Sequence, residues 1–153
     1  MDILQVVLRI AHIAAAITAG GAIVFQRFAL LPALQTLDEA PRAQLRAQLV
    51  RRWAGVVLTC VALLLVSGLL TFLLFKLPEY HGKPFAGVYH GLFGLKLLAA
   101  LALFHAVGVL VMPGEHFDRY RARARFWLSY AAALLAVVVV LAAVMRYLPA
   151  FYT

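Results

Sequence analysis

Four long apolar runs constrain what this chain can fold into more than any other feature of its sequence. They lie near residues 3–34, 53–75, 85–112 and 126–148, and each exceeds the about 20 helical residues that cross a ~30 Å hydrocarbon core. Only helices and closed barrels satisfy their own backbone in lipid, and these runs lack the alternation of barrel strands. The sequence therefore predicts an all-α fold, an integral membrane four-helix bundle in a single transmembrane domain (1–153), with helices at about 3–34, 41–76, 85–112 and 120–148.

Composition separates the chain from ordinary soluble domains. Hydrophobic residues make up 65% of it and charged residues 13%, whereas soluble domains are about 45–50% apolar and about 25% charged. The chain has one cysteine, Cys60, in the middle of the second run. An intramolecular disulfide is therefore excluded, and we expect Cys60 to act as a small packing residue.

The positive charge gathers in two of the connections between the runs. The net charge is +8, which by itself would also fit a nucleic-acid-binding protein. Cytoplasmic loops of membrane proteins carry an excess of Lys and Arg, so we interpret the arginines as a topology signal and expect no nucleic acid partner. The prediction is a multi-pass protein of a bacterial inner (cytoplasmic) membrane with both termini on the non-cytoplasmic side. The two clusters are Arg42, Arg46, Arg51 and Arg52, and Arg119, Arg121, Arg123 and Arg125.

Prolines and an acidic residue predict where the helices begin and end. Pro32 predicts that the first helix ends by Leu31, because the residue before a proline disfavours helix. Asp38 predicts the cap of an amphipathic helix that carries a proline in its first turn and runs into the second span. Pro78 predicts the end of that span.

Ionisable residues inside the first and third runs are the candidates for chemistry. His12 precedes Arg27 by fifteen residues, and His90 precedes His105 by the same interval. At ~100° per residue this spacing returns to within ~60° of the starting direction. The two faces can oppose each other, which predicts an outer layer of His12 and His90 and an inner layer of Arg27 and His105.

Two facing imidazoles in a helical bundle fit the axial ligands of a b-type haem. We therefore expect His12 and His90 to bind haem iron, and Arg9, one turn from His12, to pair with a propionate. Metal or proton handling and a purely structural role for both histidines remain alternatives. For His105, a second haem, a lipid headgroup and no ligand all stay open, and Arg27 can instead extend to the membrane surface. The small residues expected beside the ligands are Ala15, Ala16, Ala19, Gly91 and Gly94.

Lys96 lies within the third run and points ~120° away from His90. An ionisable group at this depth is costly. It needs water, a carbonyl or an anionic ligand to stay charged, which makes Lys96 a candidate site residue.

Three segments carry a resemblance to a known family. LRIAHIAAAITAGGAIVFQRF, RRWAGVVLTCVALLLVSGLL and YHGLFGLKLLAALALFH resemble the first three helices of HemJ-type protoporphyrinogen oxidases, and the CopD-like copper-resistance domain is similar in layout. The resemblance implies a small membrane haem protein that oxidises protoporphyrinogen IX with a bound b haem and passes electrons to quinone. It implies that His12 is the first-helix haem ligand, Arg52 the basic residue that opens the second helix, and Lys96 the third-helix lysine.

These observations together predict a membrane b-type haem protein in electron transfer, with one haem or two and with quinone or a porphyrin as partner. Whether the chain is an enzyme stays open; as one it is a HemJ-like oxidoreductase with Lys96 and Arg52 as catalytic candidates. One alternative is a CopD-like copper transport or resistance protein that uses His12, His90 and Met112 or Met145. Another is a cofactor-free membrane scaffold, and a homo-oligomer is compatible with each.

Overall fold

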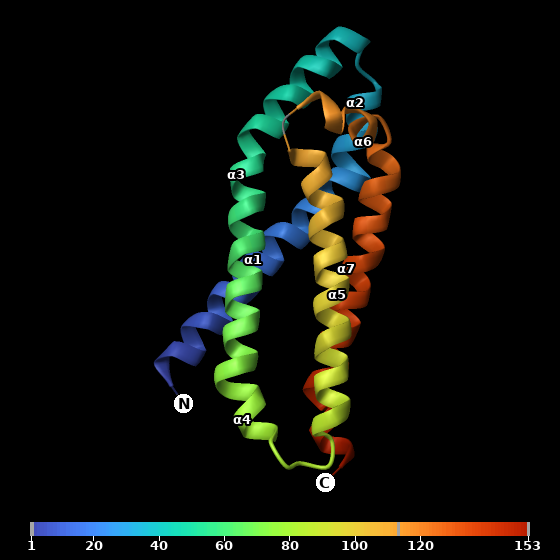
Figure 1. Ribbon diagram of the computed structural model, residues 1–153. Helices are drawn as coiled ribbons and strands as arrows, with labels where there is room; N and C mark the ends of the chain where they lie inside the picture. The colour runs from blue at the N-terminus through green and yellow to red at the C-terminus, as the bar shows by residue number, and fades with distance from the viewer. Residues whose placement is uncertain (1, 113, 153) are drawn as a thin grey trace.

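The computed structural model describes residues 2–112 and 114–152, which form helices and connections without a strand (Figure 1). The α-helices are α1 Ile3–Phe25, α2 Leu31–Gln35, α3 Glu39–Thr71, α4 Leu77–Tyr80, α5 Ala86–Val111, α6 Asp118–Ala122 and α7 Ala124–Tyr147. Two π-helical segments, Gln26–Leu30 and Phe72–Lys76, join α1 to α2 and α3 to α4. Short 3₁₀ turns cover Glu115–Phe117 and Leu148–Phe151.

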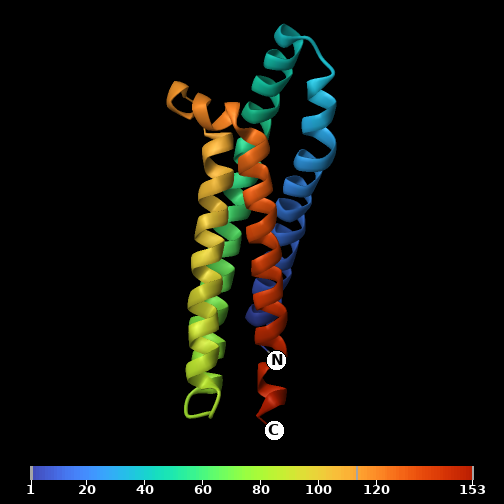
Figure 2. The same cartoon turned by 90° about the vertical axis from the view of Figure 1, so that its right-hand side faces the viewer.

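Four stretches of the described chain are long and apolar enough to cross a membrane. They are Ile3–Gln35, Glu39–Tyr80, Ala86–Val111 and Ala124–Phe151. The predicted all-α bundle is confirmed, and the chain is a multi-pass membrane protein. Both ends of the chain and the α4–α5 connection lie at one end of the bundle, whereas the α2–α3 turn and α6 lie at the other (Figures 1 and 2). We call the second end the arginine-rich end, because both arginine clusters belong to it.

The bundle is built from two close pairs of helices. α5 packs along α7, where the side chains of Ala106 and Ala131 are 0% exposed and contribute to one core cluster with Ile23 and Leu103. Small residues allow backbones to approach closely in membranes. α1 packs mainly on α3 and runs obliquely to the other long helices, so that it meets α7 toward the arginine-rich end (Figure 1).

Two prolines do not end their helices where the sequence predicts. The first span continues through Pro32 to Gln35, and the second continues through Pro78 to Tyr80. In each case a π-helical segment ends immediately before the Leu-Pro pair: the N–H of Leu31 donates to the carbonyl of Gln26, five residues back. A proline ring clashes with the carbonyl four residues earlier, and the wider π register relieves that clash, so the chain can stay helical.

The amphipathic start of α3 is confirmed at Glu39, directly after Asp38, and α3 runs unbroken into the second span. The Asp38 side chain makes no capping hydrogen bond. Instead, Arg42 donates from Nη2 to the carbonyl oxygen of Leu37 at 2.5 Å and thereby closes the α2–α3 turn. The fourth long helix begins later than predicted, at Ala124, because the chain breaks at Arg123 between α6 and α7.

Candidate functional site

A cavity of about 440 Å³ lies between the four long helices, and we call it the inner cavity. Its lining includes two of the predicted site residues, His12 from α1 and Lys96 from α5. Small residues of α1 predicted to make room for a ligand also line it, among them Ala16 and Ala19. The cavity is otherwise mostly apolar.

His12 is oriented by a hydrogen bond to α3. Its Nδ1 lies 2.8 Å from Oγ of Ser67, a residue that is only 2% exposed. The Ser67 hydroxyl donates a hydrogen bond to the carbonyl oxygen of Leu63, and with the hydroxyl in this orientation Nδ1 of His12 is the donor in the His12–Ser67 bond. The neutral ring then carries its free lone pair on Nε2, the arrangement that metal-ligating histidines adopt when the other nitrogen donates to a fixed acceptor.

Gly68 leaves the space in which the His12 ring lies. A Cβ atom at position 68 would lie 3.2 Å from Cε1 of His12. The absence of a side chain therefore lets the imidazole rest against the α3 backbone. Ser67 and Gly68 together fix both the tautomer and the position of the ring.

Lys96 is half-buried on the same cavity. Within residues 2–112 and 114–152, no hydrogen bond or ion pair is formed by its ammonium group. A charged amine inside a membrane span requires a compensating group. The inner cavity is where such a group has access to Lys96.

The inner cavity opens sideways toward the surroundings of the bundle. Ile17 of α1 and Val139 of α7 line it, and their side chains are 70% and 59% exposed. Because both belong to membrane-spanning stretches, this opening faces lipid rather than water. The exposed residues of this opening thus belong to the same cavity as His12 and Lys96.

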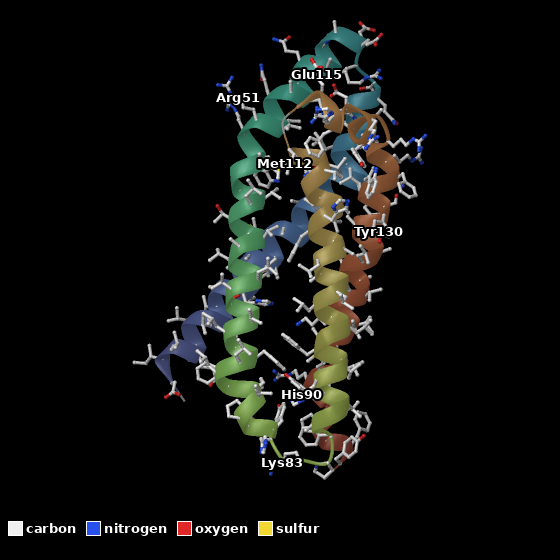
Figure 3. The ribbon with its side chains drawn as sticks, viewed as in Figure 1. Arg51, Lys83, His90, Met112, Glu115 and Tyr130 are labelled. Atoms are coloured by element: carbon white, nitrogen blue, oxygen red, sulfur yellow. The ribbon has the colours of Figure 1, made fainter. Side chains whose placement is uncertain are left out.

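His90 lies apart from the inner cavity, toward the end of α5 that joins α4 (Figure 3). Phe72 lies edge-on to the His90 ring, with 5.7 Å between centroids, and stacks on Phe93, with 3.7 Å between centroids. Phe93 lines the cavity, whereas His90 does not. The structure thus places His12 and Lys96 on the cavity together and leaves His90 behind the Phe72–Phe93 pair, consistent with the ~120° between positions 90 and 96.

The Nε2 atom of His90 is buried without a hydrogen-bond partner in the described part of the chain. Buried polar atoms in folded proteins are nearly always satisfied. This orphaned nitrogen marks a second position where a ligand or water would lower the energy.

The two residues of the predicted inner layer, Arg27 and His105, each contact α7. Nε of Arg27 donates to Oγ of Ser129 at 2.7 Å. The exposed ring of His105 lies edge-on to Trp127, with 6.2 Å between centroids. Both residues therefore anchor their helices on the first turns of α7 and lie outside the inner cavity.

The two remaining candidates lie elsewhere. Arg9 is exposed on α1 and does not line the inner cavity. Arg52 lines a second cavity of about 560 Å³ at the arginine-rich end. The two catalytic candidates from the resemblance, Lys96 and Arg52, therefore lie on different cavities.

Sequence reasoning missed Ser67 and Gly68 as partners of His12. The available signal was a hydroxyl residue followed by glycine in an otherwise apolar run, at VSGLL. No group of three or more His, Cys, Asp or Glu side chains with metal-site geometry occurs among the residues that the structure describes. No known protein family, curated protein or solved structure matches the chain.

Proposed function

We propose that this chain is a membrane b-type haem protein of electron transfer and that its haem lies in the inner cavity against His12. The observation that carries the proposal is the His12–Ser67 hydrogen bond, which leaves Nε2 of His12 as the unprotonated nitrogen of a cavity-lining imidazole. When bound, a b haem would supply one-electron cycling at iron.

The residues on the cavity fit such a group. A volume of about 440 Å³ falls within the about 300–1,000 Å³ of cofactor pockets. Lys96 would pair with a propionate carboxylate, a role the sequence had assigned to Arg9. His90 would help to hold the haem only if the Phe72–Phe93 pair moved aside, and its buried, unpartnered Nε2 supports that role.

Quinone or a porphyrin is the proposed redox partner, and oxidation of protoporphyrinogen IX is the proposed reaction. The lateral opening beside Ile17 and Val139 supports access for such lipid-soluble molecules. In this reaction the electrons and protons removed from the tetrapyrrole would pass to quinone and form quinol. The Lys96 ammonium would donate a hydrogen bond to a carboxylate or a quinone oxygen.

The proposed location is a bacterial inner membrane with the arginine-rich end in the cytoplasm. Both arginine clusters gather at this end, and cytoplasmic loops carry such an excess. Both ends of the chain would then lie on the non-cytoplasmic side.

The test is the absorption spectrum of the detergent-purified protein, air-oxidised and then reduced with dithionite. We expect a Soret band with sharp reduced α and β bands, lost in His12→Ala. Ser67→Ala should keep the ligand but lower haem affinity by about 10–100-fold, as for other groups that orient a metal ligand. His116→Ala, which changes an exposed histidine near the arginine-rich end, is the matched control and should match the parent.

A haem spectrum unchanged in His12→Ala would contradict the assigned ligand. A featureless spectrum in protein made with ample haem would contradict the proposal itself. Stoichiometric copper without porphyrin absorbance would favour the CopD-like alternative, and a folded protein with neither would favour the scaffold.

A further inference from the structure

The second cavity, which we call the arginine-end cavity, combines an apolar lining with guanidinium groups. It has a volume of about 560 Å³ and lies between the ends of α1 and α5, α2, α6 and the first parts of α3 and α7. Its apolar lining comes from residues such as Leu31, Leu34 and Leu128. Three arginines complete it: Arg46, Arg52 and Arg121.

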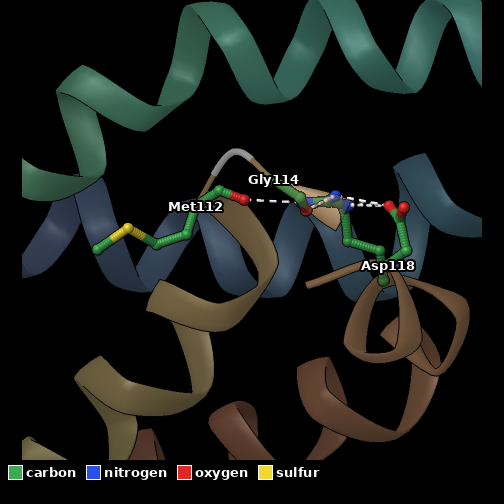
Figure 4. Close-up of polar contacts among 4 residues, drawn as sticks. Met112, Gly114 and Asp118 are labelled. Atoms are coloured by element: carbon green, nitrogen blue, oxygen red, sulfur yellow. Dashed lines mark hydrogen bonds and ion pairs between the residues drawn. The ribbon is translucent and has the colours of Figure 1, made fainter. Parts of the chain in front are cut away.

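The guanidinium group of Arg121 is already hydrogen-bonded to other groups of the protein. It donates to the carbonyl oxygens of Met112 at 2.7 Å and Gly114 at 2.6 Å, and to Oδ1 of Asp118 at 2.6 Å (Figure 4). Gly114 adopts a φ of 121°, which favours glycine, and so presents its carbonyl in this turn. The charge of Arg121 is thus balanced by Asp118.

Arg46 and Arg52 differ from Arg121 in having free guanidinium groups. Neither forms an ion pair or a hydrogen bond within the described residues. They are six residues apart on α3, about 9 Å along the helix axis and ~120° around it. Both long side chains nevertheless line the same cavity. Two unpaired cations at the mouth of an apolar cavity are complementary to an anion that carries an apolar body.

The arginine-end cavity continues into the inner cavity. Both are lined by Thr18, Ala22, Gln26 and Trp53. The combined space is long and mostly apolar, with the guanidinium groups at one end and the Lys96 amine farther along it. The arginine-rich end suits the charged end of a molecule whose hydrocarbon tail lies on the apolar lining.

We infer that the arginine-end cavity binds a phospholipid with an anionic headgroup, with its phosphate on Arg46 and Arg52. One acyl chain lies along the apolar lining toward Trp53. The inference rests on Arg46 and Arg52, which the haem proposal does not use, so either can fail without the other.

Trp53 provides the probe, because it lies where the two cavities meet and the chain has only one other tryptophan, Trp127. The Trp127→Phe protein is reconstituted in phosphatidylcholine vesicles that contain phosphatidylglycerol, with bromine on the acyl chains of one lipid or the other. Brominated chains quench a tryptophan they touch. The fluorescence quenching is compared between the two samples at equal mole fraction of brominated lipid, which gives the relative affinity of the two lipids. A bound haem would quench Trp53 equally in both samples, so it does not affect the comparison.

We expect brominated phosphatidylglycerol to be preferred at Trp53 by at least about fivefold, since each basic residue near anionic lipid contributes about 1 kcal/mol. Arg46→Gln with Arg52→Gln should remove the preference. Each single variant should reduce it, which keeps the test available if the double variant does not fold. Arg51→Gln is the matched control, because Arg51 is the neighbour of Arg52 but lies outside the cavity lining and points away from the bundle (Figure 3).

Equal quenching by both lipids in the parent would overturn the inference. So would a loss in Arg51→Gln as large as in Arg52→Gln, because it would reflect attraction of the whole surface. Abolition of the preference by millimolar inorganic phosphate, at constant ionic strength, would assign the arginines to free phosphate instead. The Trp53→Phe protein, which reports from Trp127, should show a smaller preference than Trp53.

Discussion

The His12 ring is held at residue scale by two consecutive positions of α3. Ser67 accepts a hydrogen bond from Nδ1–H, and Gly68 provides the space in which the ring lies. A functional imidazole needs both constraints, because a rotated ring presents the wrong nitrogen to a ligand. We therefore expect the proposed site to depend on Ser67 and Gly68 as well as on His12.

Gly68→Ala tests directly whether the His12 ring needs the space beside position 68. A Cβ atom 3.2 Å from Cε1 of His12 requires the ring to shift by a few tenths of an ångström. Overpacking typically costs about 1–3 kcal/mol, and the better helix propensity of alanine offsets about 0.5–1 kcal/mol of it. We expect the free energy of unfolding in detergent to fall by about 1 kcal/mol and the spectrum of bound haem to shift.

Gly55→Ala is the control on the same helix, since nothing lies within 4 Å of a Cβ there. It should be neutral or stabilising by up to about 1 kcal/mol, because alanine favours helix over glycine. Equal behaviour of the two variants would show that His12 does not depend on Gly68.

At the scale of elements, two spans accommodate a proline in the same way, by a local change to π-helix. A π-helical segment precedes both Leu31-Pro32 and Leu77-Pro78. The sequence marks each proline, but its prediction that each helix ends there is wrong. The sequence does not tell whether the helix ends or changes its hydrogen-bond register, because that depends on whether the residues after the proline pack against the bundle. After Pro32 they do, since Leu34 is buried, as is Leu31 just before the proline.

Pro32→Ala should therefore restore ordinary α-helix over 26–31. The new N–H at position 32 can donate to the carbonyl of Phe28, and one such bond contributes about 0.5–1.5 kcal/mol. We expect amide hydrogen exchange of a peptide covering 26–32 to slow by about three- to tenfold, measured by mass spectrometry in detergent.

Pro41→Ala provides the matched comparison in the first turn of α3. The first four N–H groups of a helix have no intrahelical acceptor, so exchange there should stay unchanged. Equal slowing at both sites, or none at position 32, would argue against proline as the cause of the π segment.

For the whole molecule, the charge distribution makes a topology prediction. Lys83 and Met112 lie at opposite ends of the bundle (Figure 3), and the nearby exposed His81 and His116 mark those ends. In a Cys60→Ala background, which removes the only cysteine, His81→Cys should react with a membrane-impermeant maleimide from outside intact cells. His116→Cys should react only after the membrane is opened.

The reverse labelling pattern would invert the proposed orientation without changing the fold. Labelling of both sites in intact cells would instead indicate a leaky or unfolded preparation. Unmodified Cys60, which is buried, should resist the reagent in the parent protein.

The spans and their order were predictable because hydrophobic length is a local property of the sequence. His12 and Lys96 were also identified from sequence, since an ionisable residue in an apolar run is conspicuous. Their meeting on one cavity was not predictable, nor was the exclusion of His90. Depth along a helix follows from counting residues, but which face meets which neighbour depends on the oblique path of α1 (Figure 1).

The place of the inner cavity among the membrane-spanning stretches determines how the proposed ligand would be supplied. Because the inner cavity opens beside Ile17 and Val139, its occupancy follows the mole fraction of a molecule in the bilayer, not its concentration in water. The membrane then acts as reservoir and as first filter, admitting only what partitions into it. A sparingly soluble ligand can thus saturate the cavity even when its aqueous concentration is too low to measure.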